Sequence, residues 1–433
     1  MRWPYTVICV SSIGALGETQ ERLFFAWPKG TGTGEGPMNQ ERLLIIGHGM
    51  AATRLLQQLV EREYPGSITV VSEEGGIGYN RIQLTPWLAG EVSEASLDLV
   101  DDAWYRQHRI YRVNGDAVVA LDPAGQVRLN SGRTLVFDQA VLATGALPRF
   151  PDLPFPAQPA IRAFRSKADG HWLKALPANR SAVVVGGGLL GLEAAWGLRA
   201  CGHRVSLVHR NTHLMNRQLS APTAAYLARA ASQAGIALHL GCELSHIDAK
   251  PELTSVELSS GDTLAADVLI AAAGIQPNQH LARQAGLRVN RGVLIDDQMR
   301  TSHPQLFALG ECAEYKGQTF GLVAPAYQQA EVLASVLCAE PAHWSPQQST
   351  TRLKISGLDV VSHGRIDHPD ARHLTLDAPV LNQCRRLHFL NDRLIGAEMV
   401  GIRTHLELYQ HLIEQQTPIN DARAVMLGSI KAA

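Results

Sequence analysis

Two glycine-rich segments carry the residues whose spacing points most clearly to chemistry. One is LLIIGHGMAATRLL and the other is AVVVGGGLLGLEAA, and both match the G-x-G-x-x-G/A pattern of dinucleotide sites. The residues at the pattern positions are Gly47, Gly49, Ala52, Gly186, Gly188 and Gly191. The first glycine permits a tight turn, the second lets backbone approach a pyrophosphate, and the third lets the helix pack on the strand. Two matches in one chain predict two different dinucleotides, with tight turns in a cofactor-free fold as the alternative.

Each pattern needs a β-strand before it and a helix after it, because the helix N-terminus must face the phosphates. In the first unit the apolar periodicity predicts a strand at Leu43–Ile46, a helix at Ala51–Glu63 and a second strand at Ser67–Ser72. Glu73 follows that second strand, where an acid suits the hydroxyl groups of an adenosine ribose.

The second unit is expected to repeat this arrangement. Its sequence predicts strands at 203–210, 237–246 and 253–259 and a helix at Ala221–Ala234. Arg210 ends the first of these strands, and no acid stands there to bind a free ribose 2′-hydroxyl. This favours tolerance of a 2′-phosphate but leaves the choice between NADH and NADPH open.

Composition limits the class of protein. The chain has 433 residues, enough for two or three domains, and 45% of them are hydrophobic. A formal charge of −1 and a pI near 7 disfavour binding to nucleic acid or a polybasic contact with a membrane. The six cysteines and 17 histidines show no metal-ligand spacing. We therefore expect no metal site, no disulfide framework and a reducing, cytoplasmic setting.

The first 37 residues differ in character from the rest. Arg2 and the apolar run YTVICVSSIGALG faintly resemble a signal peptide, and PKGTGTGEGP has the composition of a flexible linker. We expect residues 1–37 to be a disordered or mis-started extension before Met38. A functional arm and an export signal are the alternatives.

The order of motifs resembles the two-dinucleotide flavoprotein reductases of the glutathione-reductase-like superfamily. Several strings are similar to the FAD/NAD(P)H part of assimilatory nitrite and nitrate reductases, namely IIGHGMA, YNRIQLTPWLAGE, ATGALPR, LMNRQL and ALGECAEYKGQTFGLVAPAYQQA. A further string, TRLKISGLDVVS, resembles the C-terminal domain shared with rubredoxin reductases. The resemblance covers the chain from about Leu43 to Gly428.

The resemblance implies an α/β fold in which a Rossmann-like NAD(P)H domain is inserted into a Rossmann-like FAD domain. The FAD domain is expected at 38–155 and 276–345, and the NAD(P)H domain at 156–275. A small rubredoxin-reductase-like α+β domain is expected at 346–433.

The same resemblance assigns site residues by position. The implied FAD contacts are Gly47, Gly49, Ala52, Glu73, Arg81, Thr144, Gly145, Arg149, Gly310 and Glu311. The implied NAD(P)H contacts are Gly186, Gly188, Gly191, Glu193 and Gly274. Two other roles stay open: Arg81 as a solvated surface charge, and Cys312, beside Glu311, as a packed thiol or a redox group.

The departures from related reductases narrow the chemistry. No cysteine pair follows the first helix, the segment LTPWL lacks a peroxidatic cysteine, and Pro86 replaces the lysine of putidaredoxin-type reductases. The flavin must therefore carry the chemistry. The resemblance implies an FAD-dependent NAD(P)H oxidoreductase that passes electrons to a separate iron–sulfur nitrate or nitrite reductase component. A rubredoxin or ferredoxin reductase is the alternative, and a non-catalytic FAD-binding redox sensor is the alternative from another class.

Overall fold

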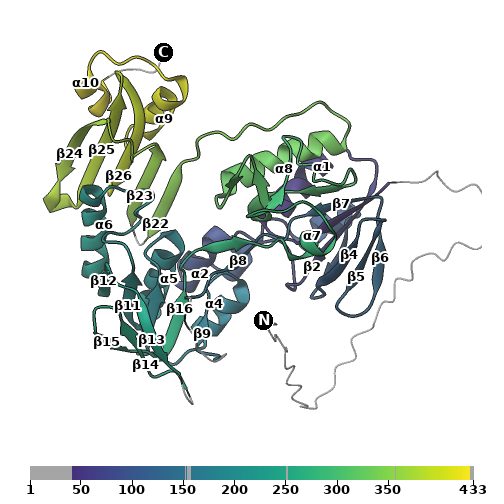
Figure 1. Ribbon diagram of the computed structural model, residues 1–433, viewed down its shortest axis with the longest axis horizontal. Coiled ribbons are helices and arrows are strands. Elements are labelled where there is room, and N and C mark those ends of the chain that lie inside the picture. Colours follow the sequence, from purple (N-terminus) through teal and green to yellow (C-terminus); the bar gives the residue numbers. More distant parts are fainter. Residues whose placement is uncertain (1–40, 152, 154–157, 250–251, 356, 430–433) are drawn as a thin grey trace, which may run out of the picture. The chain divides into compact units, whose positions relative to one another are not determined.

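The computed structural model describes residues 41–151, 153, 158–249, 252–355 and 357–429. The extension predicted at residues 1–37 lies outside these described residues. Three five-stranded sheets organise the described part of the chain (Figure 1).

The first sheet carries the first glycine pattern at the end of its central strand. Its strands, in spatial order, are β19 (Leu306–Ala308), β7 (Gln139–Leu142), β1 (Arg42–Ile46), β2 (Ser67–Ser72) and β3 (Tyr111–Asn114), and all of them pair in parallel. Leu43 and Leu44 of β1 belong to hydrophobic clusters on opposite faces of this sheet, as a parallel sheet requires. On one face, α1 (Met50–Glu61) packs against α8 (Val323–Leu337) (Figure 1).

The second sheet repeats the plan with the second glycine pattern. Its parallel strands, in spatial order, are β12 (Ile236–Leu240), β11 (Arg204–His209), β10 (Ser181–Val185), β16 (Val268–Ala271) and β9 (Ile161–Arg162). The glycine pattern leads from β10 into α5 (Leu189–Ala200), and α6 (Ala221–Gln233) connects β11 to β12.

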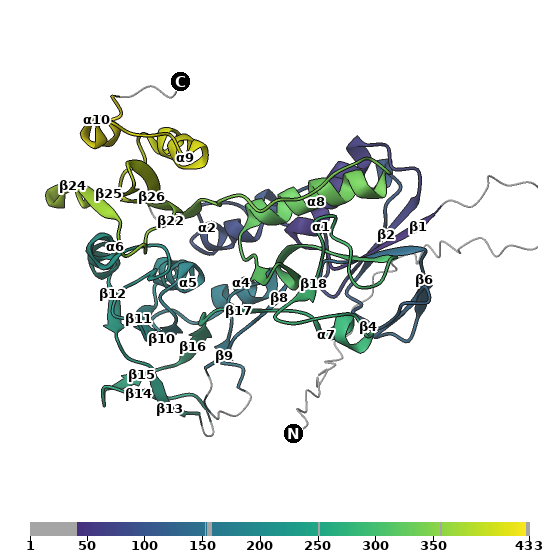
Figure 2. The same ribbon diagram turned by 45° about the horizontal axis from the view of Figure 1, so that its top comes forward.

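The third sheet is antiparallel and lies in the C-terminal part of the chain. Its strands, in spatial order, are β22 (Thr351–Ile355), β23 (Leu358–Gly364), β26 (Arg393–Val400), β25 (Gln383–Leu390) and β24 (Arg372–Ala378). Helix α9 (Leu406–Gln415) packs on β23 and β26, and α10 (Ala422–Met426) lies nearby (Figure 2). The Glu398 carboxylate of β26 accepts a hydrogen bond from the Ser220 amide before α6, at 2.6 Å.

The remaining elements are short. The additional strands are β4 (Val118–Asp122), β5 (Gln126–Leu129), β6 (Thr134–Val136), β8 (Ala146–Pro148), β13 (Leu244–Asp248), β14 (Ser255–Leu258), β15 (Thr263–Ala265), β17 (Ile275–Pro277), β18 (Val293–Leu294), β20 (Ala313–Tyr315) and β21 (Gln318–Thr319). The additional helices are α2 (Leu84–Leu88), α3 (Asp102–Gln107), α4 (Lys167–Lys174) and α7 (His280–Gln284).

These sheets confirm the predicted α/β class, with two Rossmann-like units and a small C-terminal α+β unit. The predicted domain boundaries stay predictions. The single strand expected at 237–246 is wrong, because the chain turns at Gly241 with φ +73° and divides it into β12 and β13. The helix expected at Ala51–Glu63 ends at Glu61.

Candidate functional site

The two glycine patterns adopt the same geometry at the ends of β1 and β10. Gly47 and Gly186 have φ of +105° and +123°, which disfavours side chains other than hydrogen. A Cβ atom at Gly47 would overlap the carbonyl oxygen of Ala143, and a Cβ atom at Gly186 would overlap that of Ala272. Both carbonyl groups lie just after the end of a neighbouring strand. The first glycine of each pattern is therefore required by close backbone packing.

The second glycine of each pattern faces open space. Gly49 and Gly188 cap α1 and α5, and a Cβ atom at either would meet nothing within 4 Å. Neither helix has an acid in its first turn. The unpaired N–H groups and the positive end of each helix dipole therefore suit an anionic phosphate.

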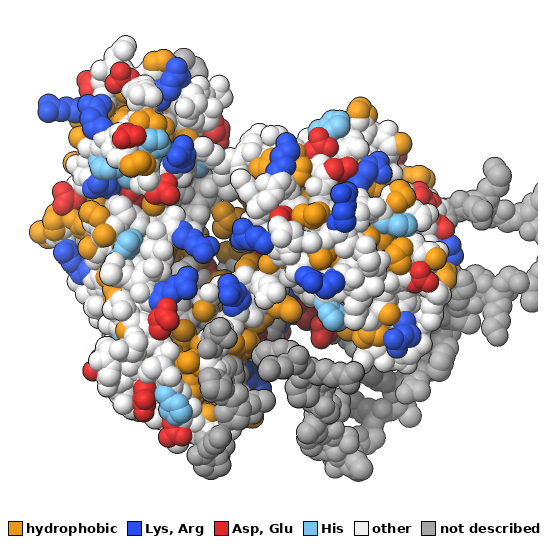
Figure 3. Space-filling model, viewed as in Figure 1, with side chains coloured by type: hydrophobic (Ala, Val, Ile, Leu, Met, Phe, Trp, Pro, Cys, Tyr) orange, Lys and Arg blue, Asp and Glu red, His pale blue; other side chains and the backbone are white. Residues whose placement is uncertain are grey.

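A cavity of about 970 Å³ extends from the first glycine pattern to the start of α5. This volume lies within the range of ligand-binding pockets. Nine predicted site residues line it, namely Gly47, Gly49, Glu73, Arg81, Thr144, Gly145, Glu193, Gly310 and Glu311. On the face shown in Figure 3, Lys and Arg side chains stand beside hydrophobic ones around a hollow.

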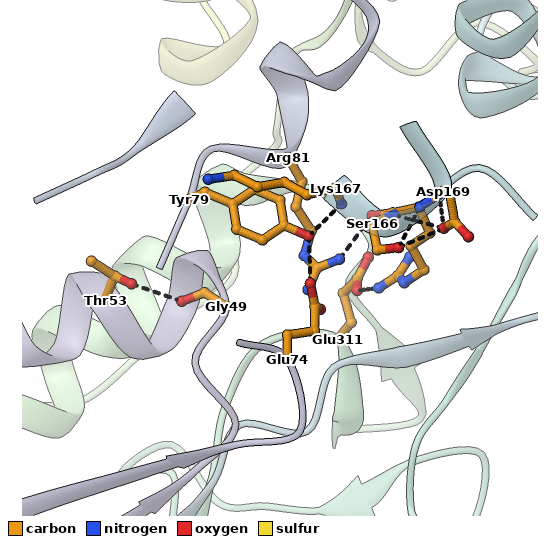
Figure 4. A network of polar contacts seen from close by, with 10 residues as sticks. Gly49, Thr53, Glu74, Tyr79, Arg81, Ser166, Lys167, Asp169 and Glu311 are labelled. Carbon is orange, nitrogen blue, oxygen red and sulfur yellow. Dashed lines mark hydrogen bonds and ion pairs between the residues drawn. The ribbon is translucent and has the colours of Figure 1, made fainter. Parts of the chain in front are cut away.

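Arg81 lies in a network of polar contacts at this cavity (Figure 4). Its guanidinium pairs with Glu74 and donates to the carbonyl oxygen of Arg165 at 2.7 Å. The Tyr79 hydroxyl donates to the same Glu74 carboxylate at 2.7 Å and accepts from the Lys167 amide at 3.2 Å. Arg81 is therefore a paired side chain at the cavity, which disfavours the alternative of a solvated surface charge.

Arg165 is a cavity residue that the sequence analysis missed. Its guanidinium pairs with Glu311, and its backbone amide donates to Asp169 at 2.9 Å. Ser166 and Asp169 form a capping box at the start of α4, which fixes the backbone beside Arg165 (Figure 4). The S-x-x-D spacing was a readable signal for that helix start, but nothing in it pointed to Glu311.

Thr144, Gly310 and Cys312 are held by bonds to their surroundings. The Thr144 hydroxyl donates to the Asn278 carbonyl oxygen at 2.8 Å, and the Gly310 amide donates to the Gln329 side chain at 2.7 Å. The Cys312 thiol is fully buried and donates to the Leu142 carbonyl oxygen at 3.3 Å. Burial raises the pKa of this thiol, so it stays protonated and fits the packed alternative.

Glu193 lies on α5 where the second unit reaches the cavity. Within the described part of the chain, its carboxyl group has no hydrogen-bonding or ion-pair partner. Burial raises the pKa of Glu193 to about 7. Glu73, by contrast, is exposed at the end of β2, where its carboxylate is accessible to ribose hydroxyls.

The other predicted site residues lie outside this cavity, and they are Ala52, Arg149, Gly186, Gly188, Gly191, Arg210 and Gly274. Ala52 is fully buried, as packing of a helix on a strand requires. The Arg149 amide donates to the Gly274 carbonyl oxygen at 3.0 Å, so these two lie together where β8 pairs with β17. Arg210 is exposed beyond β11.

The described residues contain neither a metal-ligand cluster nor a helix suited to span a membrane. No group of three or more His, Cys, Asp or Glu side chains among them is arranged to hold a metal ion. None of the helices in the same ranges is long and apolar enough to cross a membrane.

Two protein-family models match successive segments of the chain. Residues 41–330 match the family model of pyridine nucleotide-disulphide oxidoreductases, and residues 350–417 match that of the rubredoxin NAD+ reductase C-terminal domain. The assimilatory nitrate reductase electron transfer subunit of Bacillus subtilis is 33% identical over 385 residues, 88% of this chain and 50% of that relative.

A second curated relative and a solved structure are also similar to the chain. The nitrite reductase of the same organism is 33% identical over 398 residues, 90% of this chain and 49% of the relative. The chain thus spans about half the length of these curated relatives. The crystal structure of a ferredoxin reductase from Rhodopseudomonas palustris is 26% identical with a TM-score of 0.82, covering 90% of this chain and 100% of that one.

Proposed function

Since the chain belongs to the pyridine nucleotide-disulphide oxidoreductase family, whose reductases use FAD and NAD(P)H, we propose that it carries electrons from NAD(P)H to a separate iron–sulfur protein. One observation supports this most directly. A single cavity is lined by Gly49 of the first glycine pattern and by Glu193 of the second unit. Two nucleotides bound to these units would therefore meet in one cavity.

The residues at the first pattern fit FAD. We assign its ADP half to Gly47, Gly49, Ala52 and Glu73, because the open space at Gly49 and the free α1 N-terminus suit a pyrophosphate. The other residues that we assign to FAD are Arg81, Thr144, Gly145, Arg149, Gly310 and Glu311. Bound FAD supplies the redox chemistry, since it accepts a hydride and releases electrons singly.

The residues at the second pattern fit NAD(P)H. Gly188 is open to a pyrophosphate at the α5 N-terminus, as Gly49 is at α1. Glu193 then lies one turn further into the helix, where the cavity begins. We assign Gly186, Gly188, Gly191, Glu193, Arg210 and Gly274 to this site.

The acceptor that we propose is the iron–sulfur component of an assimilatory nitrate or nitrite reductase. The support is the likeness to the two Bacillus subtilis proteins. A rubredoxin or ferredoxin reductase is the second candidate, because residues 350–417 match a rubredoxin reductase domain. We also propose a cytoplasmic location, where NAD(P)H is available.

Reconstitution of electron transfer tests the acceptor. The purified chain is mixed with NAD(P)H and, in separate reactions, with a nitrate or nitrite reductase catalytic component or with rubredoxin. We expect NAD(P)H-dependent formation of nitrite or ammonium in the first reactions. Reduction of rubredoxin without turnover of either reductase component would reject the nitrogen-assimilation proposal and favour the second candidate.

A further inference from the structure

The segment after β11 folds back onto the second glycine pattern. The Gly187 amide donates to Nδ1 of His209 at 3.1 Å, and the Met215 amide donates to the Gly187 carbonyl oxygen at 2.8 Å. The side chain of His209 therefore lies against the backbone that approaches a bound pyrophosphate. This is the end of the second strand of a Rossmann unit, where the adenosine ribose is recognised.

His209 is held in one orientation as a neutral ring. Because its Nδ1 accepts from an amide, its Nε2 carries the hydrogen and donates to the Asn216 side-chain oxygen at 3.3 Å. Burial is the main cause that lowers the pKa of His209 below its usual value. The ring thus contributes no charge and, unlike an acid at this position, does not repel a phosphate.

Arg210 supplies the charge that His209 lacks. It is exposed, and within the described residues it forms no hydrogen bond or ion pair. Arg217, at the other end of the same loop, is also exposed and without such a partner there. The described loop therefore presents guanidinium groups that no protein carboxylate neutralises.

The charge pattern of the surrounding sequence also favours an anionic group at this position. Residues 194–242 contain five arginines and four histidines but no aspartate, glutamate or lysine. This stretch forms most of α5, β11, the following loop, α6 and β12. The Glu398 carboxylate reaches Ser220 at the end of this loop, but it is buried and bonded to His388 at 2.6 Å. The sequence around the ribose position is therefore rich in basic residues.

We propose that the second nucleotide site prefers NADPH and that Arg210 binds its 2′-phosphate. The proposal rests on the proposed function, because it specifies the electron donor of that same site. A guanidinium matches a phosphate with two parallel N–H···O bonds, whereas a free 2′-hydroxyl gains much less from it. Arg210 then determines the preference for NADPH over NADH, and the neutral His209 ring allows the 2′-phosphate to bind beside it.

Calorimetry with the adenosine part of the nucleotides tests this without any redox reaction. The FAD-loaded protein is titrated with adenosine 2′,5′-bisphosphate and, separately, with 5′-AMP. We expect the bisphosphate to bind about tenfold or more tightly than AMP, because charge-assisted phosphate contacts are strong. Equal binding of the two probes, tighter binding of AMP, or binding of neither would overturn the proposal.

Three variants localise the effect. Arg210→Gln should reduce the preference to about twofold or less, while the matched loop variant Arg217→Gln should retain most of it. His209→Glu should weaken bisphosphate binding more than AMP binding, because the additional 2′-phosphate also meets the new like charge. Full preference in Arg210→Gln would contradict the assignment.

The donor assay separates this proposal from the proposed function. Failure of both NADPH and NADH to reduce the bound flavin would reject the proposed function. Efficient reduction of the flavin by NADH, with no advantage for NADPH, would reject only the proposed preference for NADPH.

Discussion

Substitution of Glu193 by glutamine should stabilise the flavin-loaded protein increasingly as pH rises above about 4.5, with the full effect above neutral pH. The carboxyl group is desolvated at the cavity and has no partner among the described residues. Burial raises its pKa from 4.5 to about 7. The folded state therefore keeps a proton on Glu193 through a pH range in which the unfolded chain has lost it.

The sign and size of the effect follow from linkage. Stability falls as pH rises from about 4.5 to about 7, and the loss is complete above pH 7. At 1.36 kcal/mol for each pKa unit, the cost of ionised Glu193 reaches about 3 kcal/mol. Glutamine cannot ionise, so the Glu193→Gln variant escapes this cost.

Urea unfolding at saturating FAD measures the difference. We expect the unfolding free energies of the native and Glu193→Gln proteins to agree near pH 4. By pH 8.5 the variant should be more stable by up to about 3 kcal/mol. Glu257→Gln, an exposed site on β14, is the matched control and should show a small, pH-independent difference. A Glu193→Gln variant that is equally stable or less stable at pH 8.5 would refute the reasoning.

Three further perturbations test the two sites separately. Gly188→Trp should retain FAD but lose reduction by NAD(P)H, because the tryptophan side chain enters the open space beside the second glycine pattern only. Loss of flavin from this variant would show that the two nucleotide sites are not separate. Arg165→Met leaves Glu311 unpaired and should weaken FAD retention in gel filtration by about tenfold. The control Arg180→Met breaks the exposed pair with Asp267 and should retain FAD normally. Equal FAD retention in the two variants would contradict a role for the Arg165–Glu311 pair in holding FAD. A variant with all six cysteines changed to serine should keep most of its NAD(P)H:ferricyanide activity, and a hundredfold drop in a folded, flavin-loaded sample would restore a redox role for Cys312.

The glycine patterns made the fold and the protein class predictable from the sequence. Each pattern gives steric rules that only one local geometry satisfies, so β1 and β2 were found at the right places in the first unit. The predicted family, the enzyme class of NAD(P)H-dependent flavoprotein reductases and the use of FAD and NAD(P)H are confirmed by the family matches. The turn at Gly241 was missed because a single glycine in a β pattern also fits a bulge.

Contacts between distant parts of the chain were not predictable. Arg165 and Glu311 are 146 residues apart, and no local pattern links them. The pairing of Arg81 with Glu74 is closer in sequence, but it depends on the turn that follows β2. Burial of Glu193 likewise depends on how the cavity closes around α5, which the helix sequence alone does not encode.

Anaerobic titration of the purified, flavin-loaded chain tests the central claim most directly. The claim is that two nucleotides meet in the one cavity that joins Gly49 to Glu193. The account predicts one FAD per chain, whose visible absorbance is bleached within seconds by about one equivalent of NADPH. A purified protein that binds no flavin, or a bound flavin that neither NADPH nor NADH bleaches, would contradict it.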